Sequence, residues 1–127
     1  MTTERFKNWL KTVVDSPSFT IGKLDTSKSQ TICVYSGISA APLRAKIGNL
    51  PGYEEKSLRI LVRWGSNSVK AENKALEVYN ILRANTSITV DGKIVCIVLS
   101  HTEPVSLGTD DTGIYEFSID ATLLYER

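Results

Sequence analysis

Three kinds of residue in this sequence have side chains suited to chemistry: one histidine, a pair of adjacent carboxylates and two cysteines. His101 is the only histidine, and no nucleophile or metal-ligand spacing surrounds it, as a catalytic triad or a metal site would require. Asp110 and Asp111 lie in TDDTG, which lacks the alternating carboxylates of a calcium loop and is typical of a turn. We therefore predict no catalytic residue and no metal site.

Enzyme motifs are missing from the rest of the sequence as well. We find no glycine-rich phosphate loop, no CxxC pair, no HExxH and no nucleophile elbow, so we predict a protein that is not an enzyme and binds no cofactor. Cys33 and Cys96 lie in the apolar runs TICVY and KIVCIVL. Without a secretion signal, this pattern predicts two reduced, buried thiols.

Length and charge limit the remaining classes of function. The chain has 127 residues, 42% of them hydrophobic, and a formal net charge of +1, so we expect one domain over residues 1–127. Charges of both signs are mixed along the chain, unlike in an avid binder of nucleic acid or membrane surfaces. No apolar run reaches the ~18 residues of a membrane span, and the opening MTTERFKNWLK does not resemble a signal peptide, so we expect a cytoplasmic protein.

Two segments have the period of an amphipathic helix. The first can be capped by Thr2 or Thr3 and ends before Pro17, with apolar residues at i, i+3, i+4, i+7 and i+8. The second runs from about Ser68 to Ala84 and presents alanines and aliphatic residues on one side. Each helix must therefore dock its apolar stripe on another element.

Several extended segments predict strands. Residues 18–24 and 30–36 flank a polar turn and predict a hairpin, and SITV and KIVCIVLS flank Asp91-Gly92, a strong two-residue hairpin signal. Further strands follow from SLRILVRW and from the C-terminal segment. The order of helices and strands predicts the α+β class, with a mostly antiparallel sheet and two helices packed on one side.

The strand SLRILVRW, residues 57–64, places Arg59 and Arg63 together on its less apolar face. A basic stripe on a sheet can bind nucleic acid, but Trp64 falls on the opposite, apolar face and no aromatic-rich basic motif of single-strand readers is present. We therefore predict Arg59 and Arg63 to be protein-interface residues. The alternative is a solvated sheet face.

The C-terminal segment TDDTGIYEFSIDATLLYER, residues 109–127, alternates apolar and polar side chains over an unusual length. As a strand it would span about 40 Å, longer than a core of this size requires. Residues 36–56, with three glycines and two prolines, predict a long loop. Long strands and loops beyond a small core build surface against neighbouring chains, so we predict a protein that binds other proteins.

Three stretches also carry a family resemblance: LRILVRWGS at 58–66, KALEVYNILRAN at 74–85 and PVSLGTDDTGIYEFSIDATLLYER at 104–127. In this order they resemble the mid-chain strand, the following helix, and the turn with its aromatic-rich C-terminal strand of the small tail terminator family of long-tailed bacteriophages. Members of this family in phages and prophages are often labelled minor capsid proteins.

The resemblance implies a structural protein without catalytic residues. Such a protein forms a ring, expected to be hexameric, on the last ring of tail-tube protein, stops tube polymerisation and offers a docking face to the head connector. The implied partners are further copies of the chain, the tail tube protein and the head–tail connector protein, with no membrane and no sequence-specific nucleic acid. The implied location is the host cytoplasm during assembly and then the head–tail junction of the virion.

Two other functions remain open from the sequence. A head-closure or connector protein of the phage particle would use the same kind of domain, and only partner binding separates it from a tail terminator. A small nucleic-acid-binding α+β module is the second alternative, and it would bind with an affinity that falls steeply with salt.

Overall fold

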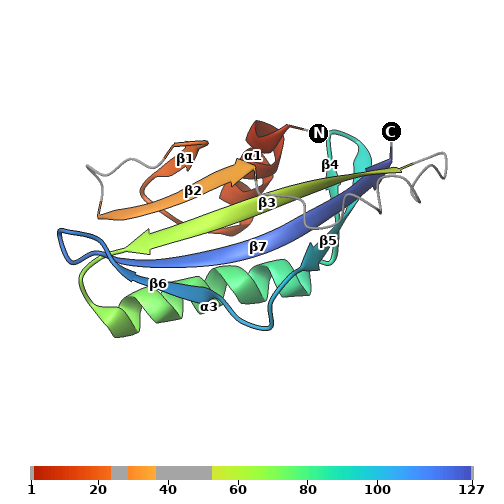
Figure 1. Cartoon of the computed structure of the whole chain (residues 1–127). Helices are drawn as coiled ribbons and strands as arrows, with labels where there is room; N and C mark the ends of the chain where they lie inside the picture. Colours follow the sequence, from red (N-terminus) through yellow and green to blue (C-terminus); the bar gives the residue numbers. More distant parts are fainter. Residues whose placement is uncertain (1, 24–28, 37–52, 127) are drawn as a thin grey trace.

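The computed structural model describes residues 2–23, 29–36 and 53–126, which form two helices and a seven-stranded sheet (Figure 1). The helices are α1 (Thr3–Val13) and α3 (Ser68–Ala84). The strands are β1 (Phe19–Ile21), β2 (Gln30–Ser36), β3 (Tyr53–Trp64), β4 (Ser87–Val90), β5 (Lys93–Leu99), β6 (Val105–Thr109) and β7 (Tyr115–Glu126). The α+β prediction is confirmed.

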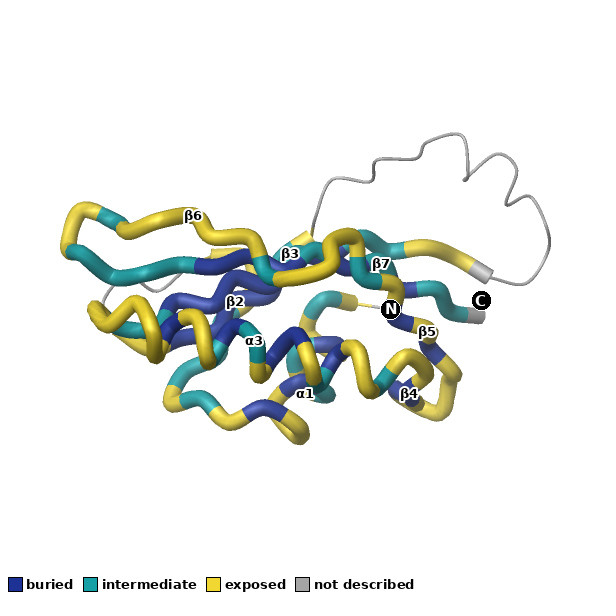
Figure 2. Tube along the Cα trace, turned by 90° about the horizontal axis from the view of Figure 1, so that it is seen from below, coloured by how far each residue is buried: buried dark blue, intermediate teal, exposed yellow. Residues whose placement is uncertain are grey.

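Both helices begin at side-chain caps. The hydroxyl of Thr2 accepts a hydrogen bond from the Arg5 amide, and the Asn67 side chain accepts from the amides of Val69 and Lys70. Such caps satisfy amides that have no partner within the helix. Both helices lie on the same side of the sheet, as Figure 2 shows, so this part of the prediction is confirmed as well.

The sheet is built around two long strands, β3 and β7, of twelve residues each. They pair antiparallel from Tyr53 opposite Glu126 to Arg63 opposite Glu116, and the strand order is β1-β2-β3-β7-β5-β4. The other edge of β7 is divided: β5 pairs with its C-terminal half, and β6 pairs with its N-terminal half. The expected long C-terminal strand therefore forms the centre of the sheet.

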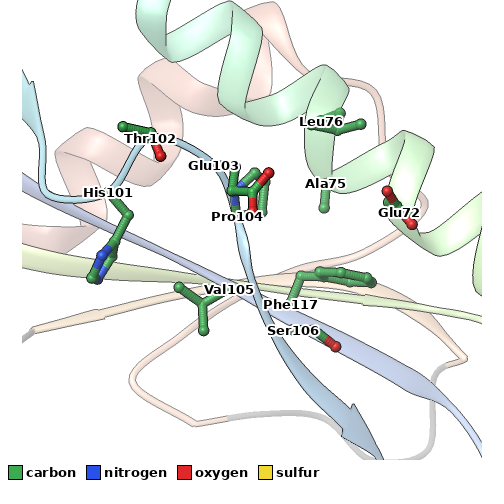
Figure 3. A pocket seen from close by; sticks show the side chains of 10 residues that line it. All are labelled: Glu72, Ala75, Leu76, His101, Thr102, Glu103, Pro104, Val105, Ser106 and Phe117. Atoms are coloured by element: carbon green, nitrogen blue, oxygen red, sulfur yellow. The ribbon is translucent and has the colours of Figure 1, made fainter.

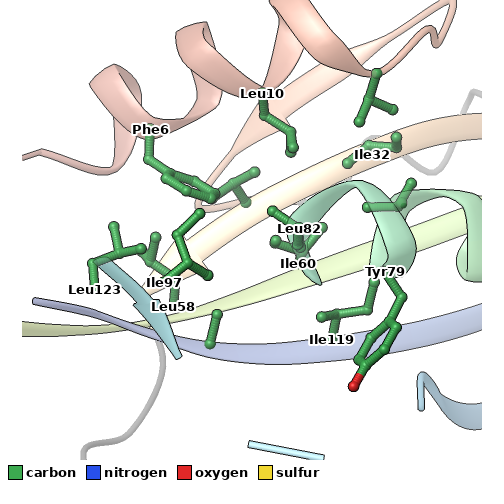
Figure 4. Packing of buried hydrophobic residues seen from close by; sticks show 14 of the residues in the cluster. Phe6, Leu10, Ile32, Leu58, Ile60, Tyr79, Leu82, Ile97, Ile119 and Leu123 are labelled. Atoms are coloured by element: carbon green, nitrogen blue, oxygen red, sulfur yellow. The ribbon is translucent and has the colours of Figure 1, made fainter. Parts of the chain in front are cut away.

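The hydrophobic core lies between the helices and one face of the sheet (Figure 4). Phe6 and Leu10 of α1 and Leu82 of α3 are fully buried against Ile60 of β3 and Leu123 of β7. Each large aliphatic or aromatic side chain buried in this way contributes roughly 1.5–3 kcal/mol relative to exposure. The core thus fixes which residues of β3 and β7 point toward the helices and which point away.

The hairpin expected from residues 18–24 and 30–36 is wrong. β1 pairs with β2 in parallel, with Phe19 opposite Ile32 and Ile21 opposite Val34. A polar connection does not specify strand direction, whereas a two-residue turn does. The Asp91-Gly92 hairpin is confirmed for that reason: both residues have positive φ, at 52° and 77°, as a tight turn between β4 and β5 requires.

Both ends of the loop expected over residues 36–56 belong to strands, because Ser36 ends β2 and residues 53–56 begin β3. Glu54, Glu55 and Lys56 have little intrinsic strand preference, but their backbone pairs with the C-terminal end of β7, and pairing with a long partner overrides local preference. Residues 37–52 of the expected loop lie outside the described residues.

The two cysteines differ, which corrects the prediction of two buried thiols. Cys33 is buried, and burial raises the pKa of its thiol, but Cys96 is exposed. Along β5, Val95 and Ile97 point into the core, while Cys96 points to the other side of the sheet, where Ile94 and Val98 are also exposed. An apolar run therefore did not mean burial on both faces.

Neither described helix is long and apolar enough to cross a membrane.

Candidate protein interface on the outer face of the sheet

We define the outer face as the side of β3, β5 and β7 that points away from α1 and α3. Successive side chains of a strand point to opposite faces. The residues that point into the core therefore determine which of their neighbours lie on the outer face. Arg59 of β3 lies opposite Asp120 of β7, and Arg63 of β3 lies opposite Glu116 of β7. Both arginines thus share one face, as predicted.

Arg59 forms an ion pair that is open to solvent. Its Nε donates to Oδ1 of Asp120 at 2.7 Å and its second terminal nitrogen donates to Oδ2 at 3.2 Å, while Nε2 of His101 lies 3.5 Å from Oδ2. The hydrogen bonds from Arg59 hold the pKa of the Asp120 carboxyl below its usual range, and Asp120 in turn raises the pKa of Arg59. The Arg59 side chain is still 43% exposed, so an approaching partner can reach it.

Arg63 is held inside the protomer. Its side chain is 3% exposed, and one guanidinium nitrogen contacts the carboxylate of Asp110 and lies 3.7 Å from Oε2 of Glu116. Asp110 belongs to the turn between β6 and β7, so this contact ties the turn to the central strand β3. A cation with so little exposure requires such anionic partners, because burial without them is costly.

Asp110 also organises the turn itself. Its Oδ1 accepts hydrogen bonds from the Ile114 amide at 3.0 Å, from the Thr112 hydroxyl at 2.8 Å and from the Thr112 amide at 2.9 Å. These bonds, the one from Ile114 first, and the contact with Arg63 hold the pKa of Asp110 well below its usual range. The interpretation of TDDTG as a turn is confirmed.

An apolar stripe occupies the β5 end of the outer face. Ile94 is 60% exposed and Val98 is 48% exposed, and the exposed Cys96 lies between them. Leu124 of β7, opposite Cys96, is half-buried. This stripe was not predicted, although Ile94, Cys96 and Val98 alternate along the sequence with Val95 and Ile97, which is the pattern of a strand with apolar residues on both faces.

A hollow of about 520 Å³ lies between the start of β6 and α3 (Figure 3). Its walls combine the apolar side chains of Leu76 and Phe117 with the carboxylates of Glu72 and Glu103. The Tyr79 hydroxyl donates to the His101 carbonyl at 2.8 Å and so fixes the chain that forms the rim. Among the described residues, no group of three or more histidines, cysteines and carboxylates is placed to hold a metal ion.

Comparison with known proteins gives one family. A family model described as "Bacteriophage tail terminator protein" matches residues 9–127, nearly the whole chain. No match was found among curated proteins. The family match agrees with the resemblance seen in the mid-chain strand, the second helix and the C-terminal strand.

Proposed function

The chain belongs to the bacteriophage tail terminator family, and on that premise we propose that it caps the growing tail tube, stops its polymerisation and joins the finished tail to the head. The observation that supports this proposal is the family match over residues 9–127. A structural role in the phage tail follows from family membership, and proteins of such a role assemble in the host cytoplasm and end in the virion. The head–tail junction is the proposed place.

We propose that the working form is a ring of identical copies, a hexamer, that contacts the tail tube protein on one side and the head connector protein on the other. Residues 1–127 would act as one domain within it. The shared hydrophobic core supports a single unit, since side chains of α1, α3 and five strands pack in one cluster. A rigid unit of this kind can present fixed surfaces to neighbours on several sides.

Within that ring, Arg59 is the proposed contact residue. Its guanidinium is partly exposed on the outer face, next to a half-buried carboxylate and an exposed histidine. Arg63 has a different proposed part: it holds the turn of residues 109–114 in place, and so shapes the surface without touching the partner. The burial of Arg63 also weakens the nucleic-acid alternative, because its charge is matched by carboxylates of the same chain.

The proposal is tested by deleting the gene from the phage or prophage that encodes it and measuring tail lengths by electron microscopy. The expected result is abnormally long tails without heads, restored to normal length when the chain is supplied from a plasmid. Tails of normal length that fail to join heads would contradict termination and favour the head-closure alternative.

A further inference from the structure

The hollow between α3 and the start of β6 has the size of a binding pocket. Its volume of about 520 Å³ falls within the roughly 300–1,000 Å³ that is usual for ligand sites. Glu72 and Leu76 project from α3, and Glu103 projects from the chain that leads into β6 (Figure 3). Ala75, a small residue of α3, and Phe117 of β7 also line this space. The hollow therefore has apolar walls and one carboxylate from each of two separate segments.

The two carboxylates of the hollow differ from other charged groups beside them. Lys74, on the same helix, pairs with Glu77 at 2.6 Å, and the His101 ring lies 3.5 Å from a carboxylate of β7. Within the described part of the chain, the side chains of Glu72 and Glu103 form no ion pair and no hydrogen bond. The hollow therefore carries a negative charge that its described neighbours do not pair with.

Apolar walls combined with carboxylates match one kind of side chain. Lysine and arginine bury a long aliphatic stem along apolar surface and keep the charged group at its end hydrated or paired. The stem can pack on Leu76 and Phe117, and the charged group can reach Glu72 and Glu103, which are both exposed. Hydrogen bonds between a cation and a carboxylate are stronger than those between neutral groups. The chemistry of the hollow thus selects a basic side chain.

The backbone of β6 can hold the segment that carries such a side chain. β6 pairs only with β7 among the described strands, and its five residues are all exposed and uncharged. An open edge of this kind accepts a strand from another chain, and alternate side chains of the added strand point to the same face. On the helix side of the sheet, that face lies over the hollow. A bulge between Ser106 and Gly108 limits the pairing, so the hollow must supply the selectivity.

We propose that the edge of β6 and the hollow together bind an extended segment of another protein, with a lysine or arginine side chain held between Glu72 and Glu103. This binding goes beyond the proposed tail function and does not depend on it. A second copy does not offer such a segment from the edges of its described sheet. The other edge strands, β1 and β4, contain no lysine or arginine, and neither does β6.

A peptide titration of the isotope-labelled chain, followed by nuclear magnetic resonance, tests the proposal. The probe is the peptide Thr-Val-Thr-Arg-Thr-Val-Thr with blocked ends. The comparison peptide has citrulline in place of arginine, which keeps the shape of the side chain but removes its charge. We expect the arginine peptide to shift the amide signals of Leu76, Ser106 and Leu107. The citrulline peptide should bind about tenfold more weakly, because a hydrogen bond to a charged group contributes roughly that factor.

Two double variants assign the preference for arginine to the hollow. Glu72→Gln with Glu103→Gln should remove the preference and leave a folded spectrum, since both side chains are exposed. Glu4→Gln with Glu55→Gln removes the same charge from exposed positions outside the hollow. This matched control should keep the preference.

Several results would overturn the inference. A folded chain that does not bind the arginine peptide, or that binds both peptides equally, contradicts a site for a basic side chain. Signals of β6 that shift with the concentration of the chain alone indicate a second copy at this edge, which contradicts the proposed partner. All of these results leave the proposed function standing, because that function is judged by tail length after gene deletion.

Discussion

Arg59 and Arg63 lie on the same face of the same strand, four residues apart, and both pair with carboxylates across the sheet. Their surroundings differ: Arg59 is 43% exposed beside Asp120 and His101, whereas Arg63 is 3% exposed between Asp110 and Glu116. The same residue type therefore has two different environments along one strand. We call the part of the outer face around Arg59 the open end, because this guanidinium is accessible to a partner. We call the part around Arg63 the closed end, because carboxylates of the same chain hold this guanidinium.

The largest loss of folding stability should come from removing the Arg63 side chain at the closed end. Arg63→Ala removes a buried cation from between two half-buried carboxylates, and breaking a buried ion pair typically destabilises a protein by about 3 kcal/mol. In a domain of this size that loss lowers the melting temperature by on the order of 10 °C. Thermal unfolding measures it, with Arg59→Ala as the matched control. A solvent-exposed pair contributes about 1 kcal/mol or less, so equal losses in the two variants would refute the comparison.

Removing the carboxylate of the turn should loosen a smaller part of the molecule. In Asp110→Ala, the amides of Thr112 and Ile114 lose their side-chain acceptor and Arg63 loses its nearest partner. We expect faster hydrogen exchange at the Ile114 amide, with little change in the core strands. Asp111→Ala, an exposed neighbour in the same turn, is the control and should leave that exchange unchanged. Faster exchange in both variants would mean that the turn does not depend on Asp110.

Low pH should reduce the stability contributed by Asp110, at the closed end, and by Asp120, at the open end, to different extents. The pKa of Asp110 and that of Asp120 are lowered in the folded state, so the stability they provide is complete above about pH 4, the usual aspartate pKa. It is lost as the pH falls toward the folded values. Denaturant unfolding at pH 6 and pH 3 measures the loss. Asp110→Asn should reduce this pH dependence more than Asp120→Asn, because Asp110 accepts more hydrogen bonds. The reverse order would contradict the assignment of roles.

Local patterns predicted much of the fold. The helices follow from apolar periodicity, and Thr2 was one of two predicted caps of the first helix, whereas the Asn67 cap of the second was not predicted. The alternation of β3 and β7 correctly separated core from outer positions. The Asp91-Gly92 turn fixed its hairpin because both residues tolerate positive φ. What failed was nonlocal: the direction of β1 depends on how it docks on β2, and the early start of β3 depends on pairing with the end of β7.

The candidate site was predictable only in part, for the same reason. The shared face of Arg59 and Arg63 follows from strand period, but the burial of Arg63 depends on the turn around Asp110, 47 residues later in the chain. The exposure of Cys96 depends on which face of β5 meets the helices. Neither fact can be obtained without the register between distant strands. Whether Arg59 contacts a neighbour stays a prediction.

We propose that Arg59, at the solvent-exposed end of the outer face, makes an assembly contact. The most direct test is the distribution of tail lengths, by electron microscopy, in the gene-deleted phage supplied with the Arg59→Glu chain. Arg5→Glu is the matched control, since Arg5 also forms an exposed ion pair, with Asp91, but lies on α1. We predict abnormally long, headless tails with Arg59→Glu, although the purified variant remains folded, and normal tails with Arg5→Glu. Normal tails with a folded Arg59→Glu chain would contradict the claim.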